Sequence, residues 1–181
     1  MINLGGKTMK ILMILDQTQA GLGGKENPDL PLGGKSMPIG SAHMLEPSLK
    51  QVDGKVVACL YCGDGYFKKN REEVKLKMAA MVKKISPDIV VCGPAFNYAG
   101  YAEMCAVLAH EINEKTDIPA IAAMSKENEE TISEYKDSVN IVIMPKKGGT
   151  GLSESLNNIC VLAKKIVDGE DINDYAKQIC Y

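Results

Sequence analysis

Two short loops of this 181-residue chain carry the residue types that could do chemistry. The first is Cys62-Gly63-Asp64-Gly65-Tyr66-Phe67, which follows the apolar run from Val56 to Tyr61. The second is Gly93-Pro94-Ala95-Phe96-Asn97, which follows Ile89 to Cys92. A thiol and a carboxylate in the first loop could serve nucleophilic or acid–base catalysis. Because ligands of open α/β sheets bind where strands end, we expect one site between these loops.

Three residues of the loops have more than one interpretation. The Cys62 thiol, at a strand end, would face the cleft, but a thiol of ordinary pKa needs an activating neighbour that the sequence does not name. Asp64 could clamp a ligand, act as a base, or organise its turn by an Asx-type hydrogen bond. Asn97 could bind a ligand or cap the helix that follows it. Position at the strand ends favours function for Asp64.

A third glycine-rich segment runs from Lys146 to Gly151, between the last expected strand and its helix. Its backbone N–H groups, its lysines and the helix start would suit an anion, with Lys147, Gly148, Gly149 and Thr150 as the binding residues. A solvated turn explains the same composition equally well. The turn Gly21 to Lys25 matches neither the dinucleotide nor the P-loop pattern, which disfavours nucleotide binding.

The sequence gives no basis for a metal or an organic cofactor in this chain. Cys59 and Cys62 have the C-x-x-C spacing of zinc sites, but they lie in an expected strand without a second pair. His43 and His110 have no spacing typical of a triad or a metal site. We interpret both histidines as surface or core residues.

The elements that must position these loops alternate between strand and helix. Five apolar runs predict strands, and three stretches with apolar residues every three or four positions predict helices. The strands are Ile11–Leu15, Val56–Tyr61, Ile89–Cys92, Ala120–Met124 and Ile141–Met144, and the helices are 70–85, 98–113 and 151–167. This pattern predicts a doubly wound α/β fold, Rossmann-like or flavodoxin-like, in which helices cover both faces of a mainly parallel five-stranded sheet.

The expected domain spans residues 9–181, and residues 1–8 have two interpretations, as an extension or as part of the domain. Residues 16–54 break the alternation with glycine and proline and contain no good strand, although 41–50 could form one short helix. A long irregular loop in a compact domain is usually functional or mobile.

Composition excludes several classes of function. The chain has 21 Lys and Arg and 23 Asp and Glu, which gives a net charge of −2. It has two Phe and no Trp. This balance disfavours nucleic acid and anionic membrane as partners. No apolar stretch is long enough to span a bilayer, and the start of the chain lacks the order of a signal peptide. Six scattered cysteines are typical of a reducing compartment, so we expect a cytoplasmic protein.

An ordered series of motifs resembles the amino-terminal part of the glycine/sarcosine/betaine reductase component B selenoprotein family. The series covers about residues 10–172 and consists of Ala20-Gly21-Leu22-Gly23-Gly24-Lys25-Glu26, Cys62 to Phe67, Gly93 to Asn97 with Gly100-Tyr101, Ile118-Pro119-Ala120, Glu127-Asn128, and the tail before Asp168-Gly169-Glu170. The resemblance implies a reductase of anaerobic amino-acid metabolism. In that family the substrate amine is held on a pyruvoyl-bearing partner subunit, and a selenolate attacks the carbon that bears the amine. The family's selenocysteine motif has no counterpart among these residues.

Our main hypothesis is a component of such a complex, which shapes the substrate pocket and docks a partner that carries the redox-active selenocysteine or cysteine. Cys62 and Asp64 would then be catalytic, Gly63, Gly65 and Tyr66 would form one wall, Gly93, Pro94, Ala95, Phe96 and Asn97 the opposing wall, and Glu127 and Asn128 the edge. The alternative is an independent small-molecule-binding protein or enzyme that uses Cys62 or Asp64 in its own cleft. A paralogue kept for assembly alone, and a homo-oligomer, both remain open.

Overall fold

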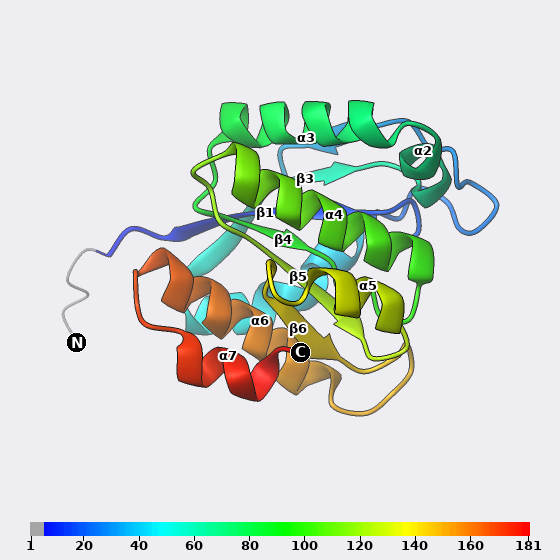
Figure 1. Ribbon diagram of the computed structural model, residues 1–181. Coiled ribbons are helices and arrows are strands. Elements are labelled where there is room, and N and C mark those ends of the chain that lie inside the picture. The colour runs from blue at the N-terminus through cyan, green and yellow to red at the C-terminus, as the bar shows by residue number, and fades with distance from the viewer. Residues whose placement is uncertain (1–5) are drawn as a thin grey trace.

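In the computed structural model, which describes residues 6–181, helices cover both faces of a six-stranded sheet (Figure 1). The order across the sheet is β2-β3-β1-β4-β5-β6, and only β2 runs antiparallel to its neighbour. The strands are β1 Met9–Leu15, β2 Gly33–Lys35, β3 Gly54–Tyr61, β4 Ile89–Cys92, β5 Ala120–Ser125 and β6 Ile141–Met144. The α/β class and the mainly parallel sheet are therefore confirmed.

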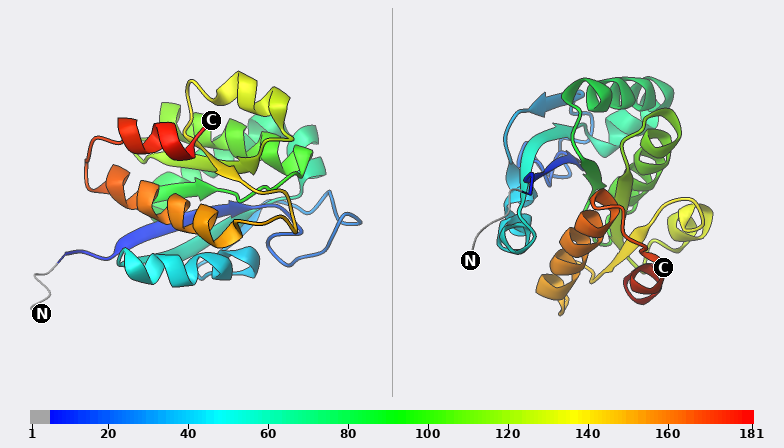
Figure 2. Two further views of the ribbon diagram at one scale, coloured as in Figure 1. Left: turned by 90° about the horizontal axis from the view of Figure 1, so that it is seen from below. Right: turned by 90° about the vertical axis from the view of Figure 1, so that its left-hand side faces the viewer.

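The parallel strands contribute residues to two separate cores, because neighbouring side chains of a strand point to opposite faces. Leu12 and Ile14 of β1 join the core under α3, α4 and α5, whereas Ile11, Met13 and Leu15 join the core under α1 and α6. Figure 2 shows these helices on the two sides of the sheet. Their bounds are α1 Glu46–Gln51, α2 Asp64–Lys69, α3 Arg71–Ile85, α4 Ala99–Lys115, α5 Glu129–Tyr135, α6 Leu152–Val167 and α7 Asn173–Ile179, with a 3-10 helix, η1, at Gly40–Leu45.

The expected count of five strands is wrong by one. The sixth, β2, lies in the glycine- and proline-rich segment where we expected no strand, and it pairs antiparallel with β3. Its sequence, Gly33-Gly34-Lys35, carries no apolar alternation. The short helices α2, α5 and α7 were also not predicted. The first begins at Asp64, so the first loop ends earlier than expected and its carboxylate lies in the first turn of a helix.

The strand order fixes where a crevice can form. β1 lies between β3 and β4. The chain that leaves β1 therefore leads toward β3, whereas the chain that leaves β4 leads in the opposite direction across the sheet, toward β5. In parallel α/β sheets ligands bind outside the carboxyl ends of the strands at such a point. At this end, on the right in Figure 1, the blue loop after β1 lies near α2 and the start of α4.

Backbone contacts fix the long segment between β1 and β3 to this end of the sheet. The N–H groups of Gly63 and Tyr66 donate to the carbonyl oxygens of Leu30 and Pro28, at 2.8 and 2.9 Å. A Cβ added to Gly63 would lie 1.9 Å from the Pro28 oxygen, so only glycine fits there. The irregular segment is therefore bound to the first loop.

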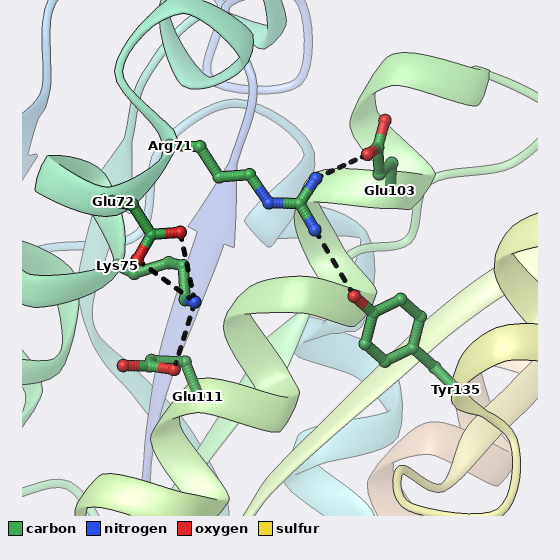
Figure 3. Close-up of polar contacts among 6 residues, drawn as sticks. All are labelled: Arg71, Glu72, Lys75, Glu103, Glu111 and Tyr135. Carbon is green, nitrogen blue, oxygen red and sulfur yellow. Dashed lines mark hydrogen bonds and ion pairs between the residues drawn. The ribbon is translucent and has the colours of Figure 1, made fainter.

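An ion-pair network braces the helices on one face (Figure 3). Arg71 of α3 pairs with Glu103 of α4 at 2.7 Å and donates to the Tyr135 hydroxyl of α5 at 3.4 Å. Lys75 lies between Glu72 and Glu111, at 3.4 and 3.6 Å. These contacts join three helices that follow successive strands.

Of the expected extension, residues 1–5 lie outside the described residues. Just before β1, Thr8 Oγ1 donates to Asp53 Oδ1 at 3.2 Å, and Lys7 pairs with Asp88 at 3.7 Å. No helix among residues 6–181 is long and apolar enough to cross a membrane.

Candidate functional site

A pocket of about 450 Å³ lies at the carboxyl ends of β1, β3 and β4. We call it the carboxyl pocket, because it contains the side chains of Asp16 and Asp64. The long segment after β1 supplies one side of it, and the start of α4 supplies the other. The lining residues are Asp16, Gln17, Thr18, Gly24, Lys25, Pro28, Asp64, Asn97, Tyr98, Ala99 and Gly100.

The Asp64 side chain is held by a buried glutamine from the neighbouring strand's loop. Gln17, 3% exposed, donates from Nε2 to Asp64 Oδ1 at 3.1 Å and accepts the Asp64 N–H at 3.2 Å. Gly65 N–H also donates to Oδ1, at 3.0 Å. The other oxygen, Oδ2, lies against Gly100, where an added Cβ would come within 2.5 Å of it. The Gly65 bond joins adjacent residues, whereas an Asx turn uses the N–H two residues on, and the Tyr66 N–H donates to Pro28 instead. The structure therefore does not show the expected Asx-type bond, and Asp64 lines the pocket.

Asp16, at the end of β1, is a second carboxyl group of the pocket and is 4% exposed. Its Oδ1 accepts the Gln19 N–H at 2.8 Å. Burial raises the pKa of Asp16 above its ordinary value, and the nearby charge of Asp64 raises it further, whereas the Gln19 hydrogen bond and Lys147 lower it. The pocket therefore holds one carboxyl that retains its proton more readily than a free aspartic acid does.

Cys62 lies in the core and not in the pocket. Its side chain is fully buried, and Sγ contacts Met104 Sδ at 3.5 Å. Burial raises the pKa of Cys62 to about 12, and the charges of Asp16 and Asp64 add to the effect. The expectation that this thiol faces the cleft is not met, and its environment opposes formation of a thiolate.

The loop Gly93 to Asn97 divides between core and pocket. Ala95 and Phe96 are buried, and only Asn97 of the five residues lines the carboxyl pocket. Phe96 has a positive φ of 50°, and its carbonyl oxygen accepts the Asn128 Nδ2–H at 2.8 Å and the Ser125 N–H at 2.9 Å. Asn128 therefore holds this loop from the end of β5.

Asn97 does not cap α4, which begins at Ala99 after Tyr98. Its Oδ1 instead accepts the backbone N–H of Lys147 at 3.0 Å, and Lys147 Nζ lies 5.8 Å from the centre of the Tyr98 ring. The expected anion-binding segment thus lies beside the rim of the pocket. Gly148 and Gly151 in it have positive φ, and α6 starts directly after it.

A second hollow of about 620 Å³ adjoins the carboxyl pocket at Asp64 and Gly100. We call it the acidic hollow, since Glu103, Glu127, Glu129 and Glu130 line it together with Lys68. Gly65 and Asn128 also line it, so the hollow brings together a residue of the first expected wall and the two residues of the expected edge, Glu127 and Asn128. Tyr66 instead packs against the core, and neither it, Gly63 nor Gly93 lines either hollow.

Sequence reasoning missed Asp16 and Gln17. Both directly follow the apolar run of β1, so the rule that marked Asp64 and Asn97, polar residues at strand ends, would have found them. The glycine-rich composition of the next residues directed attention to the nucleotide pattern. Among residues 6–181, no group of three or more His, Cys, Asp or Glu side chains could hold a metal ion.

The arrangement is that of an α/β protein with a polar pocket at the switch point of its sheet. Residues 8–180 match the family described as glycine/sarcosine/betaine reductase selenoprotein B, and the chain belongs to that family. No solved structure matches the chain significantly.

Curated relatives agree with this assignment. The glycine reductase complex component B subunit gamma of Carboxydothermus hydrogenoformans is 32% identical over 163 residues, 90% of this chain and 37% of the relative. The corresponding subunit of Peptoclostridium litorale is 31% identical over 171 residues, 94% and 38%. The sarcosine reductase complex component B subunit beta of Peptoclostridium acidaminophilum is 28% identical over 161 residues, 89% and 36%. The chain therefore spans well under half the length of these relatives.

Proposed function

We propose that this chain forms the substrate-pocket part of a glycine/sarcosine/betaine reductase-type complex in the cytoplasm. Its carboxyl pocket would shape the site for a small amino acid or amine, while a partner carries the redox-active selenocysteine or cysteine. In the resembling family a second partner bears the pyruvoyl group. The reaction would be the reductive removal of the amine.

The observation that carries this proposal is the position of Asp64. It is held by Gln17 at the carboxyl end of β3, and it borders both the carboxyl pocket and the acidic hollow. A ligand in the carboxyl pocket and a segment of the partner that enters through the acidic hollow would meet at Asp64. The strand order about β1 supports a doubly wound, flavodoxin-like assignment, in which this end of the sheet binds ligands.

The alternative of an independent enzyme that uses Cys62 receives no support from its surroundings. The thiol is buried against Met104, and its pKa of about 12 leaves it protonated at neutral pH. A partner-borne nucleophile is therefore the simpler proposal.

Co-purification tests the proposal. The tagged full-length chain would be recovered from its own cells under anaerobic conditions, and the bound proteins identified by mass spectrometry. We expect a polypeptide with a redox-active selenocysteine or cysteine, or a pyruvoyl subunit. Recovery of the chain alone would contradict the proposal. The cell extract must be concentrated enough that other multisubunit reductases stay assembled.

A further inference from the structure

The lining of the acidic hollow carries an excess of negative charge. Five carboxyl groups and one lysine line it, namely Asp64, Glu103, Glu127, Glu129 and Glu130, with Lys68. Of the five, only Glu103 takes part in a salt bridge among residues 6–181, and its partner is Arg71 (Figure 3). Lys126 and Lys146 lie near enough to Glu127 for their charges to act on it, without a salt bridge. The remaining carboxyls favour an occupant that brings positive charge.

Asn128, at the start of α5, adds an acceptor to the hollow. An asparagine before a helix ordinarily accepts a backbone N–H of the first turn, but Asn128 makes no such cap. Its Nδ2 donates to the carbonyl oxygens of Phe96 and Ser125, at 2.8 and 3.1 Å, which leaves the amide oxygen for another partner. Asn128 is 6% exposed and lines the hollow.

The oxygen of Asn128 keeps access to the hollow. Within residues 6–181, the side-chain oxygens that are fully buried and have no hydrogen bond are the hydroxyls of Ser41 and Ser125, and Asn128 Oδ1 is not one of them. Buried polar groups of proteins are normally hydrogen-bonded. An almost fully buried residue with a free acceptor therefore favours an occupant that donates hydrogen bonds, as lysine and arginine side chains do.

The carboxyls of the hollow do not converge on one point. They come from three elements, since Asp64 begins α2, Glu103 lies in α4, and the other three lie at the start of α5. In the part of the chain that the structure describes, no group of three or more acidic side chains is close enough to hold a metal ion. Several positive groups along one polypeptide would match this spacing better than a single ion.

Helix dipoles account for only part of the cluster. Acidic residues are favoured in the first turn of a helix, which explains Glu129 and Glu130 without any ligand. The same effect does not explain Glu103, in the second turn of α4, or Glu127, which precedes α5. Nor does it explain the free oxygen of Asn128.

We propose that the acidic hollow is a docking surface for a basic segment of a protein partner, whose lysine or arginine side chains pair with Glu127, Glu129 and Glu130. The inference rests on the proposed function, because it states the chemistry of the segment that enters beside Asp64. Complementary charge of this kind steers association and fixes how two proteins are oriented.

A peptide of defined composition tests the surface. The probe is a short fluorescein-labelled peptide in which glycine and arginine alternate, and a glycine–glutamate peptide of the same length is its control. Fluorescence anisotropy measures the Kd of each peptide for the full-length chain at low and at physiological salt. We expect the arginine peptide to bind, and more weakly as salt is added, because exposed charges are screened. An arginine peptide that fails to bind at low salt would overturn the inference.

A triple variant assigns binding to the hollow. Glu127→Gln, Glu129→Gln and Glu130→Gln together should weaken binding of the arginine peptide at least about tenfold, because three modest ion pairs are lost at once. Native circular dichroism of the variant shows that its fold is retained. An unchanged Kd in this variant would contradict the inference.

A second triple variant controls for net charge. It removes the same charge from three exposed side chains that do not line the hollow and that belong to no salt bridge among residues 6–181. The substitutions are Glu114→Gln, Glu154→Gln and Asp174→Asn, and the last two lie in the first turns of α6 and α7. We expect its Kd to stay within about threefold of the unsubstituted chain. An equal loss of affinity in both triple variants would show that net charge alone attracts the peptide, and would overturn the inference.

The two proposals fail separately. A reductase partner recovered equally well with the unsubstituted chain and with the hollow variant would overturn the docking surface and leave the reductase assignment standing. Selective binding of the arginine peptide to the hollow, in a chain that recovers no reductase partner, would do the reverse.

Discussion

The two regions on either side of the first loop, Cys62 to Phe67, differ in burial and in polarity. Behind the loop lies a thiol core of buried residues, namely Cys62, Cys92, Tyr101, Met104 and Cys105. In front of it lies the carboxyl pocket, open to solvent and lined by polar atoms. Cys62 and Asp64 are two residues apart, yet the Cys62 side chain is buried in the core and Asp64 lines the pocket.

The contrast teaches that closeness in sequence to a site does not give a residue the chemistry of that site. Burial raises the pKa of every thiol in the core, and the Tyr101 hydroxyl donates to the Ile14 carbonyl at 2.7 Å instead of facing a ligand. The pocket, by contrast, holds carboxyls supported by hydrogen bonds from Gln17 and Gln19. The chemistry that we propose for the pocket is therefore electrostatic and not thiol-based.

We expect the largest effect from replacement of Gly63, the residue between the thiol core and the carboxyl pocket. Gly63→Ala should lower the free energy of unfolding by about 3 kcal/mol, because the backbone can relieve the clash only by moving. The new Cβ would lie 1.9 Å from the Pro28 oxygen and 2.8 Å from the Leu30 nitrogen. Urea titration followed by circular dichroism measures the change.

Gly6→Ala is the control for that experiment. A Cβ there would meet no atom within 4 Å, so we expect a change below about 0.5 kcal/mol. Equal stability of the two variants would show that the contact between the long segment and the first loop is not tight.

The second test separates the two regions by activity. In the proposed reductase complex, Asp64→Asn should lower kcat/KM about tenfold to a hundredfold, which is what loss of a hydrogen bond to a charged group costs. The free energy of unfolding should change by less than about 1 kcal/mol. Cys62→Ala should leave kcat/KM within about twofold and lower the free energy of unfolding by about 1 kcal/mol. The opposite pattern, an inactive Cys62→Ala and an active Asp64→Asn, would return the chemistry to the thiol.

A smaller effect concerns the pH dependence of stability. The folded-state pKa of Asp16 is raised, so the folded chain binds this proton more tightly than the unfolded chain does. Its contribution to stability is full below the unfolded pKa and is lost as pH rises through the folded pKa. Asp16→Asn should therefore raise Tm near pH 8 relative to the unsubstituted chain, and the gain should shrink on acidification toward pH 4. A gain that grows on acidification would contradict the raised pKa.

The smallest expected effect is in thiol chemistry. In the native chain at pH 8, iodoacetamide should modify Cys180 first, since it is the one cysteine among residues 6–181 that is partly exposed. Even there burial raises the pKa to about 11, so the reaction should be slower than that of a free thiol. Peptide mapping by mass spectrometry gives the order. Faster labelling of Cys62 than of Cys180 would show that the thiol core opens.

Much of the framework could be predicted because its signal is local. Ile89–Cys92 and Ile141–Met144 were predicted with their observed bounds, and Arg71–Ile85 within one residue, since apolar runs and helical spacing report directly on burial. The polar residues directly after the apolar runs also predicted at which end of the sheet the pocket lies. Asp64 and Asn97 do line the pocket.

The remainder depended on contacts between distant segments. β2 exists because Gly33-Gly34-Lys35 pairs with β3, and nothing in its own three residues indicates a strand. Asn97 would have been a reasonable helix cap, but the backbone of Lys147 takes its oxygen. Cys62 is buried in contact with Met104, 42 positions further along the chain, and no local pattern reveals that contact.

The reciprocal bonds between Gln17 and Asp64 also have a kinetic consequence. They join residues 47 positions apart, and β2, η1, α1 and β3 lie in the chain between them. Contacts of long sequence separation are slow to form, because loop closure opposes them until the rest of the structure compensates. The pocket should thus be among the last features to assemble during folding, and a newly made chain would gain the ability to hold its ligand only when its sheet is complete.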